Sequence, residues 1–408
     1  MIFILKYFIL IPIASLSFAD NLAKIKMDSS NNNSYETNFG LELFTNLLQT
    51  SDAAAESNMC ISPFLLEALL SLVYLGSDGK TAEELKDKLQ LQRFPNNGKM
   101  ANYFAGNLAI VTQDSIDTQL EICSRILIND NFEVDAQFKK IAENYFLTTT
   151  DLVKFENREE VLKVIRTKVE KCLKKSFDDI SVKDNALALL LLAANFKNKW
   201  FLPFSAYRSG LYDFHIAADC IKSIPMMLDN EMMIKFVELK ELDARVVELP
   251  YEHDDELSML LILPNKRDGL KELELKIKDL NFQILTEQMQ MESVQLLLPK
   301  FKIDFECSLR RVMEQMGFNL MFSEESNFKN LLAANSISTA LPFSDIWHKA
   351  SIEVNESGSE AAKVEASKPI VISNAIDTRQ KFFRADHPFF FAIRNREATF
   401  FVGHVKQF

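Results

Sequence analysis

Hydrophobic positions along this chain follow two different spacings, which predict both helices and strands. Apolar residues recur every three or four positions in some segments and form short unbroken runs in others, as expected for amphipathic helices and buried strands. The helical spacing predicts helices over residues 39–50, 64–75, 81–91, 137–147, 159–177 and 308–316. The other segments predict strands over residues 122–127, 186–196, 246–251, 257–264, 294–303 and 400–405.

The run over residues 186–196, ALALLLLAANF, is apolar throughout. Strands that are covered on both faces have this unbroken pattern, so we expect it to lie in the middle of a sheet. No stretch rich in proline, glycine or serine separates the predicted elements, and no internal repeat is present. The sequence therefore marks no boundary between domains, although a chain of 408 residues could hold two or three.

Three predicted helices begin with residues that are typical of helix starts. Ser62 precedes Pro63, and proline is favoured at the first position of a helix. Thr81 and Glu84 have the spacing of a capping box, in which each side chain binds a free backbone N–H at the helix start. Ser308 is expected to cap the helix that follows it.

Residues 354–383 follow neither spacing, although strand-like runs flank them at 344–354 and 382–393. The first part of the segment consists mainly of small and polar residues. Long stretches without secondary structure are uncommon in compact domains and are usually functional or disordered. On its own, this pattern fits a functional loop and an unstructured surface loop equally well.

The N-terminal residues 1–19 have the features of a signal peptide. An apolar run over residues 7–13 precedes Ser17-Phe18-Ala19, which resembles a cleavage site, and the run is too short to span a membrane. This predicts a secreted, extracellular protein of residues 20–408 that does not span a membrane. Asn32 begins an Asn-x-Ser sequon and is predicted to be glycosylated.

Composition and motifs exclude several functional classes. A net charge of −11 argues against general binding to nucleic acid. The five cysteines are scattered without metal-type spacing, so we expect buried thiols and no metal site. The chain has no G-x-S-x-G elbow, no H-E-x-x-H motif and no phosphate loop, which predicts a protein that is not an enzyme and needs no cofactor.

Two separated motifs resemble the serpin family of protease inhibitors. The first matches the family's hinge and the second its C-terminal strands, and the matching residues are Glu356, Gly358, Ser359, Glu360, Ala361, Ala362, Phe383, Pro388 and Phe389. Further similarity extends over residues 38–407. It implies one mixed α/β (α+β) domain with three β-sheets, eight or nine helices and an exposed reactive-centre loop at about 356–383.

The resemblance implies inhibition by loop insertion. A serine or cysteine protease would attack the loop and form an acyl-enzyme, and the cut loop would then enter the main sheet as a new strand. The family keeps the hinge glycine roughly fourteen residues before the cleaved bond, which places that bond at Ile372–Ser373. An aliphatic residue there suits a chymotrypsin- or elastase-like protease; Val371 and Asn374 are the alternatives. The inhibitor would act as a monomer.

Other family positions fall on residues outside the loop. Trp200 and Lys300 match the region where insertion begins, called the breach, in which Lys300 would pair with Glu356. Ser62 and His348 match the polar cluster called the shutter, which controls opening of the sheet. The usual asparagine of that cluster is replaced by Leu192.

The loop also departs from the family in a way that favours a second interpretation. Alternate residues of an inserted strand face the core, and here the core-facing set is Ser359, Ala361, Lys363, Glu365 and Ser367. Burying an unpaired charge costs several kcal/mol, although Lys363 and Glu365 have opposite signs and could pair. With Leu192, these charges favour the alternative of a non-inhibitory serpin that acts as a carrier, chaperone or decoy.

Overall fold

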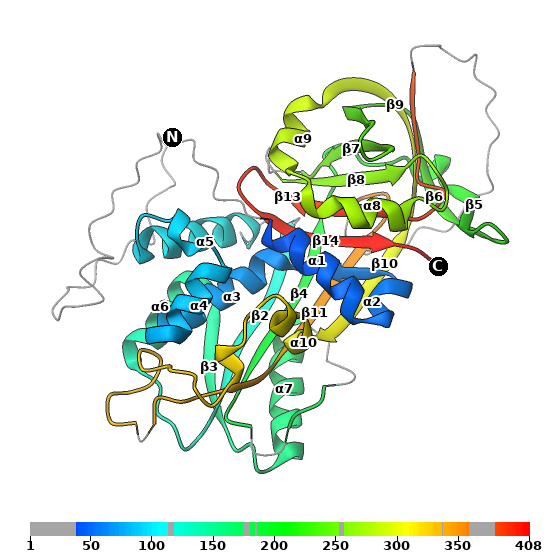
Figure 1. Cartoon of the computed structure of the whole chain (residues 1–408). Coiled ribbons are helices and arrows are strands. Elements are labelled where there is room, and N and C mark those ends of the chain that lie inside the picture. The colour runs from blue at the N-terminus through cyan, green and yellow to red at the C-terminus, as the bar shows by residue number, and fades with distance from the viewer. Residues whose placement is uncertain are drawn as a thin grey trace, which may run out of the picture.

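The structure is a computed structural model that describes residues 38–112, 118–173, 180–183, 186–252, 257–336, 338–358 and 380–408 (Figure 1). The signal peptide, Asn32, the hinge residues Ser359–Ala362 and the bond Ile372–Ser373 lie outside these residues. Lys363 and Glu365 also lie outside them.

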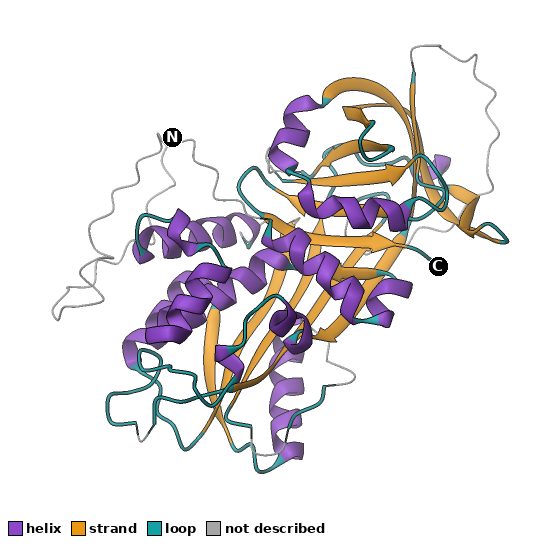
Figure 2. Ribbon diagram, in the orientation of Figure 1, coloured by secondary structure: helices purple, strands orange, loops and turns teal. Residues whose placement is uncertain are grey.

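The described part contains ten α-helices, most of which lie in the N-terminal half of the chain. They are α1 (Phe39–Thr50), α2 (Asp52–Glu56), α3 (Pro63–Gly76), α4 (Gly79–Lys88), α5 (Asn97–Val111), α6 (Ala136–Phe146), α7 (Arg158–Leu173), α8 (Leu270–Lys276), α9 (Phe282–Gln288) and α10 (Arg310–Gln315). Figure 2 shows α7 set apart from the group formed by α3 to α6.

One sheet has five strands in the order β10-β11-β4-β2-β3. Their bounds are β10 (Phe301–Ser308), β11 (Phe343–Val354), β4 (Ala188–Asn198), β2 (Thr118–Asn129) and β3 (Thr148–Val153). The central strands β11 and β4 are parallel, whereas the pairs β10–β11 and β2–β4 on either side are antiparallel. We call the ladder between β4 and β11 the seam.

The second sheet has nine strands, with β1-β14-β13-β8-β7-β6-β9-β12 along its path and β5 paired to β6. Their bounds are β1 (Met59–Ile61), β5 (Gly210–Ala217), β6 (Cys220–Leu239), β7 (Ala244–Pro250), β8 (Ser258–Pro264), β9 (Gln290–Pro299), β12 (Lys381–Arg384), β13 (Phe389–Arg394) and β14 (Thr399–Val405).

Strand β4 is buried on both faces, as its apolar run predicts. Leu190, Leu192 and Ala194 belong to the large core that includes α3. Leu189, Leu191 and Ala193 belong to a smaller core that includes α7. Because successive side chains of a strand point to opposite faces, α3 and α7 cover opposite faces of the five-stranded sheet.

The α+β class is confirmed, while the number of elements differs from the expectation. Two sheets are present in the described part instead of three, because the 20-residue strand β6 pairs with β5, β7 and β9 and joins two regions into one sheet. Ten helices are present instead of eight or nine. The strand predicted over residues 294–303 is two strands, β9 and β10, separated at Lys300.

Helix α3 begins at Pro63 with Ser62 before it, as predicted, but none of the predicted side-chain caps forms, because these side chains bind other segments. The Ser62 hydroxyl donates to the Phe400 carbonyl at 2.7 Å, and the Ser308 hydroxyl donates to the carboxylate of Asp345. In the supposed capping box, Thr81 accepts the backbone N–H of Asn327, and Glu84 accepts those of Asn319 and Leu320. These side chains hold distant parts of the chain together.

Candidate functional site

The described part of the hinge is a tight turn at the end of β11. Backbone hydrogen bonds join Asn355 N–H to the Gly358 carbonyl at 2.6 Å and Gly358 N–H to the Asn355 carbonyl at 3.1 Å. The Asn355 side chain also accepts the N–H of Ser357 at 2.9 Å. The chain therefore changes direction at Asn355–Gly358, at the start of the predicted loop.

This turn is bound to the segment that follows β4. Trp200 N–H donates to the Ser357 carbonyl at 2.8 Å, and Phe204 N–H donates to the Glu356 carbonyl at 2.9 Å. Gly358 forms an antiparallel bridge with Lys199. The hinge is thus already paired, in the antiparallel sense, with the chain that leaves β4 at the edge of the seam.

Gly358 is required here by both conformation and space. Its φ of +136° is a conformation that residues with side chains rarely adopt. A Cβ atom on Gly358 would lie 2.1 Å from the Asn198 carbonyl oxygen and 2.6 Å from the Lys199 Cα. Any other residue would force the hinge away from the end of β4.

Glu356 and Lys300 form an ion pair beside this turn, as the resemblance implies. Glu356 is only 4% exposed, so its charge has lost most of its water. Burial acts to raise the pKa of the Glu356 carboxyl, but hydrogen bonds from Lys300 and Ser209 outweigh it and lower the pKa overall. The carboxylate is therefore charged near neutral pH, and Lys300 is the cation that balances it.

Trp200 packs directly under the hinge. Its indole Nε1 donates to the Asn355 carbonyl at 3.0 Å. Its ring stacks on Tyr251 with 4.7 Å between ring centroids and 9° between planes. A buried indole needs both a hydrogen-bond acceptor and an apolar contact, and the hinge carbonyl and Tyr251 supply them. The resemblance identified Trp200, but Asn355 and Tyr251 carried no signal in the sequence.

The shutter residues meet in the middle of the seam. His348 of β11 is level with Leu192 of β4, and its Nε2 accepts the backbone N–H of Ser62 at 3.0 Å. Burial lowers the pKa of the His348 imidazole to about 4, and the backbone of Leu192 opposes this only weakly. The ring is therefore neutral near pH 7 and carries its proton on Nδ1, because Nε2 is an acceptor.

The Nδ1–H of His348 lacks a good partner. It makes no hydrogen bond of normal geometry within the described part of the chain. A leucine at position 192 offers no polar side chain to it. The backbone of Leu192 is its only partner among the described residues, and a buried donor so poorly paired costs up to about 3 kcal/mol, so the seam contains a polar group that an added acceptor would stabilise.

A second polar cluster on β11 was not expected from the sequence. Lys349 is 3% exposed, and its ammonium contacts Glu306 at 2.9 Å and Asp304 at 3.3 Å, both on β10. Burial acts to lower the pKa of Lys349, but the two carboxylates raise it overall. A lysine inside an otherwise buried strand is a weak sequence signal for such a cluster. These contacts fasten β11 to β10, on the side away from the seam.

The site does not assemble a catalytic dyad. His348 binds the backbone N–H of Ser62, while the Ser62 hydroxyl donates to Phe400. Within the described residues no group of three or more His, Cys, Asp and Glu side chains is placed to hold a metal ion. No helix among the same residues has the length and apolar character needed to cross a membrane.

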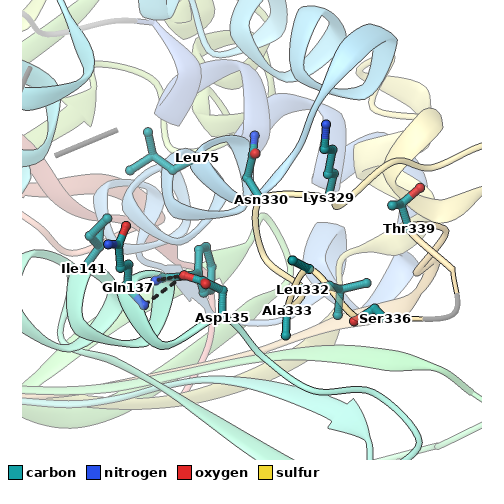
Figure 3. A pocket seen from close by; sticks show the side chains of 12 residues that line it. Leu75, Asp135, Gln137, Ile141, Lys329, Asn330, Leu332, Ala333, Ser336 and Thr339 are labelled. Atoms are coloured by element: carbon teal, nitrogen blue, oxygen red, sulfur yellow. Dashed lines mark hydrogen bonds between the residues drawn. The ribbon is translucent and has the colours of Figure 1, made fainter. Parts of the chain in front are cut away.

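A pocket of about 390 Å³ lies at the start of α6, beside residues 329–339 (Figure 3). The charged residues at its wall are Asp135 and Lys329. Asp135 already accepts the backbone N–H groups of Gln137 and Phe138, at 2.8 and 2.9 Å, and so caps α6. The pocket shares no residue with the hinge or the seam and adds nothing to the site.

Comparisons with known proteins agree with the resemblance. The sequence profile of the family described as Serpin (serine protease inhibitor) matches residues 34–407. Serine protease inhibitor 42Dd of Drosophila melanogaster is 29% identical over 87% of this chain and 92% of its own length. Antichymotrypsin-2 of Bombyx mori is 28% identical over 90% of this chain and 95% of its own length. The crystal structure of Serpin48 from Tenebrio molitor, at 26% identity, covers 91% of this chain and 96% of its own with a TM-score of 0.79.

Proposed function

Because the chain belongs to the serpin family of serine protease inhibitors, we propose that it inactivates a protease by inserting its own cleaved loop into the seam. The target is a chymotrypsin- or elastase-like serine protease, or a cysteine protease of similar preference, cleaving Ile372–Ser373. The likeness to Antichymotrypsin-2 of Bombyx mori supports this class of target. The protein acts as a secreted monomer, glycosylated at Asn32 and without a cofactor.

The parallel ladder between β4 and β11 is the observation that carries this proposal. A strand that enters the seam from the hinge runs antiparallel to both neighbours, in the sense in which Gly358 already pairs with Lys199. Insertion would exchange one parallel ladder for two antiparallel ladders. Antiparallel pairing is slightly more stable per residue, and the number of ladders rises by one, so the exchange releases free energy.

The positions that Lys363 and Glu365 would take beside β4 favour insertion, although their charges alone argue against it. Continuing the pairing of Gly358 with Lys199 residue by residue along β4 brings Glu365 opposite Leu192. Residues directly opposite in an antiparallel pair share a face, and Leu192 faces the large core at the level of His348. A carboxylate there would accept the unpaired Nδ1–H of His348.

Lys363 would then lie two residues from Glu365 on the same face, opposite Ala194. Three groups would share the buried charge: an ammonium, a carboxylate and an imidazole. Such a network costs far less than isolated buried charges, provided that each member is hydrogen-bonded. Glu365 would take the place of the asparagine that Leu192 replaces, and this supports inhibition over the non-inhibitory alternative.

Incubation with chymotrypsin or pancreatic elastase tests the proposal. We expect a protease–inhibitor complex that survives boiling in SDS and a small C-terminal fragment whose first residue is Ser373. A Glu365→Ala variant should form less complex and more cleaved inhibitor, because His348 would again lack a partner. An Ala366→Ser variant, with its side chain on the opposite face, is the matched control and should behave as the original chain.

Cleavage of the loop with full recovery of protease activity would contradict inhibition and support the carrier, chaperone or decoy function. A comparison of thermal unfolding separates these outcomes further. Insertion predicts that the cleaved form unfolds at a much higher temperature than the intact form. Equal unfolding temperatures would show that the cleaved loop stays out of the seam.

A further inference from the structure

Two cysteines from different elements meet at one guanidinium group. Cys123 lies on β2 and Cys172 near the end of α7. The Nε–H of Arg125 donates to the Cys123 sulfur at 3.4 Å, and its Nη2–H donates to the Cys172 sulfur at 3.7 Å. Nε and Nη2 form one edge of the guanidinium, so the two sulfurs lie side by side like the oxygens of a bidentate carboxylate.

Cys123 also contacts α7 directly. Its thiol donates to the backbone carbonyl of Lys168 on that helix at 3.9 Å. Arg125 cannot move away easily, because its Nη1 also donates to Asp151 at 2.7 Å and to Thr149 at 2.8 Å. The guanidinium therefore holds both sulfurs in one place, and the cluster connects α7 to the edge of the five-stranded sheet.

Helix α7 shares a core with both strands of the seam. The small core under α7 contains residues of β2, β4 and β11, including Leu191 of β4 and Trp347 of β11. The indole Nε1 of Trp347 donates to the Ser181 carbonyl, just beyond α7, at 3.1 Å. A strand that enters the seam separates β4 from β11, so these contacts must loosen.

We propose that Cys123 and Cys172 are a disulfide site that fixes α7 to β2 and restrains opening of the seam. The restraint on insertion rests on the function proposed above, whereas formation of the disulfide does not. Cys172 is half-buried and Cys123 is buried, so a peroxide reaches Cys172 first. Burial raises the pKa of the Cys123 thiol to about 12, which also makes it the poorer first nucleophile.

The reaction consumes one peroxide for each disulfide. The Cys172 sulfur attacks the O–O bond of hydrogen peroxide, and sulfenic acid and water form. The Cys123 sulfur then attacks the Cys172 sulfur; the S–S bond forms, the S–OH bond breaks, and the hydroxide leaves as water with the Cys123 proton. Two thiols and one peroxide give one disulfide and two waters.

The test uses the full chain carrying Cys220→Ser, because Cys220 is exposed and could link two molecules. The protein is treated with hydrogen peroxide, its remaining thiols are blocked, and its peptides are mapped. We expect a linked peptide pair containing Cys123 and Cys172, and a rise of several degrees in the unfolding temperature that a reductant reverses. Cys172→Ser should abolish both effects, whereas Cys307→Ser, which alters another partly buried thiol, should keep them.

Inhibition is then measured before and after oxidation. The ratio of cleaved inhibitor to protease–inhibitor complex should rise about tenfold, as a barrier increase of about 1.4 kcal/mol for insertion would produce. An unchanged ratio in a protein that carries the mapped disulfide would overturn the restraint. Absence of the linked peptides would overturn the disulfide site itself. If the reduced protein inhibits no protease, the proposed function fails, and peptide mapping still decides the disulfide site.

Discussion

The nine-stranded sheet and the five-stranded sheet differ in what lies at their centres. The interior strands of the nine-stranded sheet pair antiparallel, and five phenylalanines of β13 and β14 are fully buried: Phe389, Phe390, Phe391, Phe400 and Phe401. The five-stranded sheet has a parallel ladder at its centre, with the buried His348 in the ladder and the Glu356–Lys300 pair at its end. Of the two sheets in the described part of the chain, the five-stranded one has a central ladder that a new strand could improve.

This difference shows where the molecule can store free energy. A strand inserted between two antiparallel neighbours must run parallel to one of them, so the nine-stranded sheet would lose a central antiparallel ladder and gain one ladder of each kind. A parallel seam with an unpaired imidazole donor gains both backbone and side-chain hydrogen bonds. The predictions below alter the hinge, the ion pair and the imidazole, which are the features that distinguish the seam.

Replacing Gly358 with alanine should reduce the formation of protease–inhibitor complex more than the other substitutions at the seam. The added Cβ would clash with the Asn198 carbonyl and require an unfavourable φ, so the turn and its bridge to Lys199 would open. Strain and lost hydrogen bonds together should cost roughly 4 kcal/mol. Complex formation should fall at least tenfold, measured by SDS gel as the ratio of complex to cleaved inhibitor.

Gly106→Ala in α5 is the matched control for this substitution. No atom lies within 4 Å of the Cβ that it would introduce, and a helical alanine is preferred to glycine. This variant should be slightly more stable than the original chain and should inhibit as well. If Gly358→Ala also inhibited normally, the hinge turn would have no part in directing the loop.

Removal of the cation at the hinge should have the next largest effect. Lys300→Met leaves the buried carboxylate of Glu356 without its partner, which should lower the free energy of unfolding by about 3 kcal/mol. Denaturant titration at pH 7 measures this loss. The control is Lys302→Met, because Lys302 is 61% exposed and its 3.5 Å pair with Glu353 should contribute less than about 1 kcal/mol. Equal losses in the two variants would show that burial adds nothing to the hinge pair.

Sequence patterns predicted local structure better than they predicted contacts between distant segments. Helix α1 has the predicted bounds, and β4 begins and ends within two residues of them. Helix α5 was missed although Met100, Phe104 and Leu108 follow helical spacing, because its glycines and asparagines weaken the helical signal. The long strand β6 was missed because its apolar and polar residues alternate irregularly.

In the candidate site too, sequence patterns did not predict contacts between distant segments. The resemblance identified Glu356, Lys300 and Trp200, which the structure brings together at the hinge. Local patterns misjudged the side chains of Thr81 and Glu84, since a capping motif does not reveal that the distant segment 319–327 competes for them. Whether His348 has a second hydrogen bond depends on residues brought together only by folding, so the sequence alone could not show its unpaired Nδ1–H.

The imidazole of His348 should make the stability of the intact protein depend on pH. An unfolded chain protonates this histidine below about pH 6.5, whereas burial lowers its native pKa to about 4. The unfolded state therefore binds more protons between these values, and native stability falls as the pH falls from 6.5 toward 4. From pH 7 to pH 5 this histidine should account for about 2 kcal/mol of lost stability. The difference between the original chain and His348→Gln, measured by denaturant titration at both values, isolates this effect from other groups.

The pKa of His348 should differ between the loop-cleaved form and the intact form. If Glu365 lies beside His348 after insertion, its carboxylate stabilises the protonated imidazole and raises the pKa of that group toward its ordinary value. The loss of stability attributable to His348 between pH 7 and pH 5 should then be smaller in the cleaved form than in the intact form. Cleaved Glu365→Ala should recover the larger dependence. The intact form, the cleaved form and cleaved Glu365→Ala could instead all lose the same stability between pH 7 and pH 5. Glu365 would then not reach the seam, and the register that pairs the residues after Gly358 with β4 would be wrong.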